Sequence, residues 1–162
     1  NCYKIQLLLS LLGKSCEWVD VDIMKGETRA PSFLEKTPNG KIPLLELDDG
    51  RVLSESNAIM HYIACNSPYV PSSPYHFSQL LQWQFFEQYS HEPYIAVARY
   101  INVYLVFPED KKAEYESKQA GGYRALAVME HQLNLTPYLL GDSISLADIS
   151  LFASPGTVYK CR

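Results

Sequence analysis

The beginning of the chain carries apolar side chains at helical spacing. Ile5, Leu8, Leu9 and Leu12 recur at i, i+3, i+4 and i+7, which places them on one face of a helix. Gly13 follows at the position where helices often end in a left-handed residue. The pattern predicts a helix that packs through one face and stops at Gly13.

The pattern then changes to that of strands and turns. Apolar and polar residues alternate from Trp18 to Ile23, which predicts a strand with one buried face. The polar stretch 25–39 predicts a loop with a short helix around Ser32 to Lys36. The segments 42–47 and 52–53 flank Asp48-Asp49-Gly50, and an Asp-Gly step favours the tight turn of a hairpin.

A second helix is predicted from Ser56 to Cys65, with Ile59, Tyr62 and Ile63 facing inward. The order helix, strand, helix, hairpin, helix lacks the parallel strand that normally precedes such a first helix. We therefore expect the chain to begin after that strand and to need upstream residues for activity. Pro155-Gly156 breaks the last helix, so we expect truncation at the far end too.

A change of composition separates this half from the rest. Ser67 to Pro74 holds three prolines and three serines, which is typical of a linker. We expect a first domain at 1–67, a linker at 68–74 and an all-helical domain at 75–162.

Helical periodicity runs through the second half, interrupted by Pro93 and Pro108. The apolar positions with this spacing are Phe77, Leu81, Phe85, Tyr94, Val97, Ala98, Ile101 and Leu105. In the charged helix after Pro108, Leu126, Met129 and Leu133 are expected to face inward. A last helix should start at Ser145, where Asp148 completes a capping box and Ile144 and Ile149 form a hydrophobic staple.

Composition excludes several classes of function. The formal net charge is −4 with no basic block, which argues against nucleic acid or anionic lipid as a partner. No apolar run approaches the roughly 20 residues that span a bilayer. The four cysteines form no CxxC pair and no metal-ligand spacing with the histidines. We expect reduced thiols, a cytoplasmic location and no metal.

Two short segments carry candidate chemistry. A cis bond at Ile42-Pro43 would turn the Ile42 backbone outward to pair with a peptide-like ligand, although an edge-strand proline explains the residue equally well. Ser56 opens a helix whose N–H groups suit a carboxylate, and Glu55 suits an ammonium group. Plain helix capping is the alternative for this pair.

These segments resemble those of bacterial-type glutathione transferases. The resemblance is carried by Asn1-Cys2-Tyr3-Lys4, Thr37-Pro38-Asn39-Gly40-Lys41-Ile42-Pro43, Glu55-Ser56-Asn57-Ala58-Ile59 and Ser145-Leu146-Ala147-Asp148-Ile149. It runs from Asn1 to about Ala153. It implies an α/β thioredoxin-like N-terminal domain, here without its first strand, and an all-α C-terminal domain.

The resemblance also implies roles for individual residues toward glutathione, which would be the substrate. Ile42 would pair by its backbone with the cysteinyl part, and Pro43 would be the cis proline of the fold. Glu55 and Ser56 would hold the γ-glutamyl group. Lys41, with Lys25 or Arg29, would face the glycyl carboxylate.

The family activates the glutathione thiol with a donor that precedes the first helix, and this chain retains only Asn1 and Cys2 there. The alternative interpretation of Cys2 is that it is simply a small buried hydrophobic residue. Tyr3 is a weaker candidate because the helical turn should point it away.

An electrophile pocket between the domains would use Tyr94 and Arg99, near Tyr89 and His91. The alternative interpretation is that these aromatic residues, which recur at helical spacing, form core or dimer contacts.

The resemblance implies a homodimeric detoxification enzyme that transfers the glutathione thiolate to small electrophiles or peroxides. One alternative is a non-catalytic module like that of elongation factor gamma subunits. Another is an inactive truncated product.

Overall fold

The computed structural model describes residues 1–152, and these form two compact units that divide between Asn66 and Ser67. The predicted break at Pro155-Gly156 and Cys161 lie outside the described residues. Within the described residues, no helix is both long enough and apolar enough to cross a membrane.

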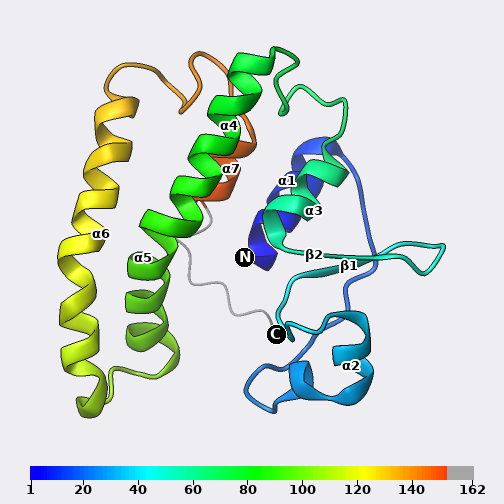
Figure 1. The fold of residues 1–162 in the computed structure, drawn as a ribbon, viewed down its shortest axis with the longest axis vertical. Coiled ribbons are helices and arrows are strands. Elements are labelled where there is room, and N and C mark those ends of the chain that lie inside the picture. Colours follow the sequence, from blue (N-terminus) through cyan, green and yellow to red (C-terminus); the bar gives the residue numbers. More distant parts are fainter. Residues whose placement is uncertain (153–162) are drawn as a thin grey trace. The chain divides into compact units, whose positions relative to one another are not determined.

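The first unit opens with helix α1, Cys2–Leu12, as the sequence predicts. Ile5, Leu8 and Leu9 are buried, and α1 packs beside α3 (Figure 1). Gly13 ends the helix with φ 63°, and its N–H donates to the carbonyls of Leu9 and Ser10. The left-handed stop is confirmed.

The predicted strand at Trp18–Ile23 is wrong. This segment is irregular, and Trp18, Val19 and Ile23 are exposed. A strand requires a neighbour with which to exchange backbone hydrogen bonds. In residues 1–152 only one pair of strands does so, and neither strand pairs with this segment.

A short helical segment and a hairpin follow. Glu27–Arg29 forms a 3₁₀ turn, and helix α2 spans Pro31–Lys36, where a short helix is predicted. Strand β1, Leu44–Glu46, pairs antiparallel with β2, Val52–Ser54, with Leu45 opposite Leu53. Gly50 turns the hairpin with φ 82°. The predicted hairpin is confirmed, with shorter strands.

Helix α3, Ser56–Ile63, completes the first unit. Ile59 and Met60 are fully buried, and Ala64 beyond the helix end is buried too. Tyr62 was expected to face inward but is 49% exposed. The buried side of α3 contains Met60 rather than Tyr62, and the apolar residues of this short helix are compatible with either choice of face.

The described part of the second unit, residues 67–152, is mostly helical. Helix α4, Pro74–Phe86, passes through a π-helical turn at Glu87–His91 into α5, Glu92–Arg99. The interruption therefore ends two residues before Pro93, which the sequence marks as a break. A second π-helical turn, Tyr100–Tyr104, and a 3₁₀ turn, Glu109–Lys111, lead to α6, Lys112–Leu133. Helix α7, Leu146–Phe152, packs against α4 (Figure 1).

Small residues line the face of α6 that meets α5. Gly121, Gly122 and Ala125 are buried there, whereas Leu126 and Leu133 are 37% and 43% exposed. The expectation that these leucines face inward is wrong. Their large side chains lie outside the close contact, because the glycines bring the two helices together.

The start of α7 confirms the predicted capping box. The Asp148 carboxylate accepts hydrogen bonds from the Ser145 N–H and hydroxyl, each at 2.8 Å, and the Ala147 N–H donates to the Ser145 hydroxyl at 3.2 Å. The other Asp148 oxygen accepts from the Leu139 N–H at 2.8 Å, which ties the preceding loop to the same cap.

Asp148→Ala should therefore lower the free energy of unfolding of the helical unit by about 1–2 kcal/mol. The substitution leaves the N–H groups of Leu139 and Ser145, both in buried residues, without their acceptor. Chemical denaturation measures the change. Asp142→Ala removes a carboxylate from the same loop at an exposed position and should leave the midpoint in place. Equal midpoints for the two variants would contradict the assigned cap.

Candidate functional site

The entry to the hairpin presents an unused stretch of backbone. The Ile42-Pro43 peptide bond is cis, as the sequence suggests, and both residues are half-buried. Neither the N–H nor the C=O of Ile42 forms a backbone hydrogen bond with any residue in 1–152. This segment therefore has the free groups that an added strand of ligand would use.

The start of α3 lies directly after β2. Glu55 holds a φ of 69°, which is rare for a residue with a side chain, and its carbonyl accepts the Ile59 N–H at 3.0 Å. Ser56 is only 5% exposed, and its hydroxyl has no hydrogen-bond partner among the described residues. The Glu55 carboxylate is exposed, also with no partner in that part of the chain.

This arrangement offers opposite charges at neighbouring points. The first N–H groups of a helix have no partner within the helix and favour an anion. A carboxylate beside them favours a cation. Glu55 and Ser56 together can therefore hold a zwitterionic amino-acid group, and the unusual φ of Glu55 is a feature found at functional sites.

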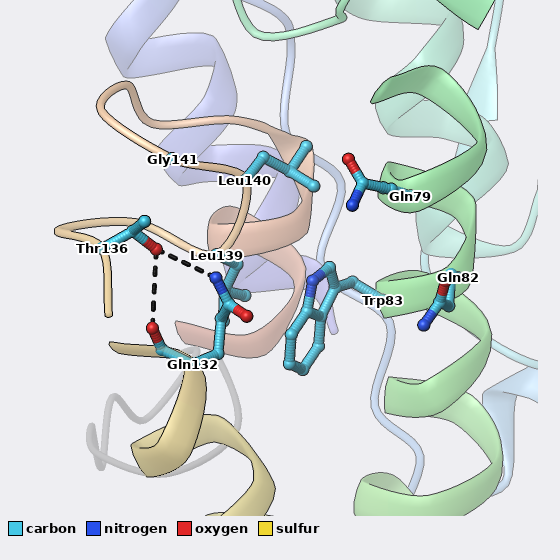
Figure 2. Close-up of a pocket in the computed structure, with 8 residues that line it drawn as sticks. All are labelled: Gln79, Gln82, Trp83, Gln132, Thr136, Leu139, Leu140 and Gly141. Atoms are coloured by element: carbon cyan, nitrogen blue, oxygen red, sulfur yellow. Dashed lines mark hydrogen bonds between the residues drawn. The ribbon is translucent and has the colours of Figure 1, made fainter. Parts of the chain in front are cut away.

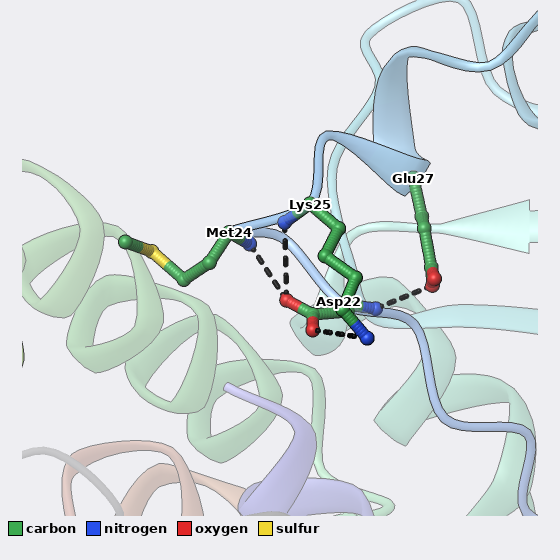
Figure 3. A network of polar contacts seen from close by, with 4 residues as sticks. All are labelled: Asp22, Met24, Lys25 and Glu27. Atoms are coloured by element: carbon green, nitrogen blue, oxygen red, sulfur yellow. Dashed lines mark hydrogen bonds and ion pairs between the residues drawn. The ribbon is translucent and has the colours of Figure 1, made fainter.

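Lys25 lies on a loop held by carboxylates (Figure 3). Its ammonium pairs with Asp22 at 3.4 Å, and the other Asp22 oxygen accepts the N–H groups of Met24 and Lys25. Glu27 in turn accepts the Asp22 N–H at 2.7 Å. The hydrogen bond from the Lys25 backbone is the main cause that lowers the pKa of Asp22. The ion pair is exposed, so it holds Lys25 only weakly.

The other two predicted basic residues differ in their surroundings. The Lys41 side chain is exposed and its ammonium has no partner within the described residues. Arg29 donates from Nη1 to the Asn39 carbonyl at 3.4 Å. Arg29 is thus joined to the turn that precedes Ile42, whereas Lys41 is available to a ligand.

Two of the remaining predicted residues lie at the start of α1. Asn1 is exposed at the N-cap position, and the Cys2 side chain is half-buried. In the second unit, Arg99 is half-buried near the end of α5, and His91 is buried in the π-helical turn. The Tyr94 ring lies against Gly121 of α6. This contact is of the helix-packing kind that the sequence leaves open for Tyr94, whose side chain is half-buried.

A shallow pocket of about 190 Å³ lies within the second unit (Figure 2). Trp83 of α4 faces the loop that contains Thr136 and Leu139, and Gln132 donates to the Thr136 hydroxyl at 2.9 Å. No charged side chain lines this pocket, and none of the sequence-predicted site residues belongs to it. It lacks the charges that recognise a zwitterionic peptide.

The fold and the site define a class of protein. Residues 1–73 match the model "Glutathione S-transferase, N-terminal domain", and residues 75–160 match "Glutathione S-transferase, C-terminal domain". The chain belongs to the glutathione S-transferase family. It combines a thioredoxin-like N-terminal domain with a helical C-terminal domain, as the resemblance implies.

Individual relatives fall into two groups. A glutathione S-transferase structure from Pseudomonas fluorescens is 57% identical with a TM-score of 0.93, over 94% of this chain and 76% of that one. Glutathione S-transferase F10 of Arabidopsis thaliana is 38% identical over 85% of this chain and 67% of its own length. Elongation factor 1-gamma of Danio rerio is 37% identical over 83% of this chain, which spans only 30% of that protein.

Proposed function

We propose that the chain is part of an active glutathione S-transferase that adds the glutathione thiolate to small electrophiles or uses it to reduce peroxides. The arrangement of Glu55 and Ser56 after the cis-proline hairpin carries this proposal. Few ligands need both an amino-acid group and a short stretch of extended backbone, and glutathione needs both.

Each part of glutathione has a proposed partner. Its cysteinyl N–H and C=O pair with the free backbone of Ile42, and the bend at Pro43 exposes those groups. The γ-glutamyl ammonium meets Glu55, and its carboxylate meets the Ser56 N–H and hydroxyl. The glycyl carboxylate is drawn to the basic side chains of Lys41 and Lys25.

Chemistry requires the thiol to be ionised, because an unperturbed thiol has a pKa of about 8.5. The Asn1 amide is the proposed donor to the thiolate, with Cys2 at the helix start as the second candidate. Tyr94 and Arg99 are proposed to contact the electrophile.

We further propose that the protein is a cytoplasmic homodimer that acts in detoxification. Analytical ultracentrifugation tests whether it forms a dimer in solution.

A non-catalytic module is the second candidate, and the 37% identity to elongation factor 1-gamma favours it. Conjugation of glutathione to 1-chloro-2,4-dinitrobenzene by the full-length protein distinguishes the two. The transferase proposal expects turnover that saturates with glutathione. Glutathione binding without turnover of this probe or of cumene hydroperoxide would support the module.

A further inference from the structure

We propose that Arg29 is a positioning residue: it holds the turn before Ile42 in place and does not bind the glycyl carboxylate itself. This inference rests on the proposed glutathione site. It assigns Lys41 and Arg29 different tasks: Lys41 contacts the ligand, and Arg29 supports the turn that precedes Ile42.

The first observation is the close packing around Gly40. An added Cβ on Gly40 would lie 2.7 Å from Arg29 Nη1, 2.9 Å from the Thr28 carbonyl oxygen and 3.1 Å from Leu34 Cδ2. Gly40 also has a φ of 61°, which few residues with a side chain adopt. The 3₁₀ turn at Glu27–Arg29 and the turn around Gly40 therefore touch through their backbones.

The second observation is the hydrogen bond from Arg29 to the Asn39 carbonyl at 3.4 Å, at the long end of the usual range. The Gly40 N–H donates to the Thr37 carbonyl at 2.9 Å, so the residues from Thr37 to Gly40 form one closed turn. The guanidinium thus lies against this turn and is bonded to it.

Ile42 is only two residues beyond Gly40. A shift of the turn therefore moves the backbone groups that pair with the cysteinyl part of the ligand. Removing the guanidinium should lower the affinity for every ligand that pairs with Ile42, whether or not the ligand carries a glycyl carboxylate. A direct contact would instead weaken only ligands with that carboxylate.

Calorimetric titration of the full-length protein with glutathione and with its glycyl monoethyl ester separates these roles. For Arg29→Met we expect the affinities for both ligands to fall by the same factor, about threefold to tenfold. Lys41→Met is the matched control, because Lys41 is the proposed contact of the glycyl carboxylate. Lys41→Met should lower the affinity for glutathione and leave the affinity for the ester unchanged.

A loss by Arg29→Met that is confined to glutathione would overturn the inference, as would unchanged affinity for both ligands. Gly40→Ala provides a second arm: it should also weaken both ligands equally, and selective loss of glutathione binding would again contradict the positioning role. If the wild-type protein binds neither ligand, the proposed glutathione site fails, and this inference fails with it.

Discussion

Gly121→Ala is expected to lower the free energy of unfolding of the helical unit by about 2–3 kcal/mol. The new Cβ would overlap the Cδ1 and Cε1 atoms of the Tyr94 ring, in the contact between α5 and α6. Alanine normally stabilises a helix interior by about 1 kcal/mol relative to glycine, so the expected sign is opposite to that of helix propensity. Urea denaturation of the full-length protein measures the effect.

Gly122→Ala is the matched control for this substitution. It makes the same chemical change one residue later, but its Cβ would approach Cδ1 of Ile95, a flexible side-chain end, at 2.9 Å. We expect a much smaller loss. In a Tyr94→Ala background the penalty of Gly121→Ala should largely disappear, since the ring that causes the clash is gone. A penalty that persists without the ring would show that the packing is assigned wrongly.

Glu55→Gln and Ser56→Ala should each weaken glutathione binding by about tenfold to a hundredfold, because each removes a charge-assisted contact worth about 1.5–3 kcal/mol. The stability of the protein should change little, since the Glu55 carboxylate has no partner in the described chain and the Ser56 hydroxyl has none either. Isothermal titration calorimetry gives the affinities.

Glu46→Gln provides the control on the same hairpin. Glu46 is exposed and pairs with Lys36, away from the start of α3. An exposed ion pair contributes little, so this variant should bind glutathione as the wild type does. Wild-type affinity in both Glu55→Gln and Ser56→Ala would remove these residues from the site.

The elements that follow from local signals were predictable from the sequence. Gly13 ends α1 because its left-handed conformation suits glycine, and the Asp-Gly step at 49–50 closes the hairpin. The hydrogen bonds from Ser145 to Asp148 join residues that are three positions apart. In each case, the residues that determine the structure are neighbours in the chain.

Features that depend on distant partners were not predictable. The alternation in 18–23 has the pattern of a strand, but strand pairing needs a neighbour that no local pattern supplies. The contact of α5 with α6 uses Gly121 and Gly122, which carry no hydrophobic signal. Helical periodicity therefore predicted that Leu126 and Leu133 face inward, whereas both are exposed.

The candidate site was partly predictable. The strand-opening Pro43 and the acidic-Ser helix start point to it, and the cis bond is present. The positive φ of Glu55 was not predictable, because glutamate does not favour that region. Arg29 was recognised as a basic residue, but its contact with the Asn39 carbonyl depends on how two loops pack. The Asn39-Gly40 step is a local signal that could have located that turn.

The most direct test of the glutathione site is amide NMR of the isotopically labelled full-length protein during titration with glutathione. We expect the largest shifts at the N–H groups of Ile42 and Ser56, with Glu55 also affected and the Trp83 indole unmoved. Saturable shifts at these amides would support backbone pairing and capture of the γ-glutamyl group. Unmoved Ile42 and Ser56 signals at saturating glutathione would contradict the account.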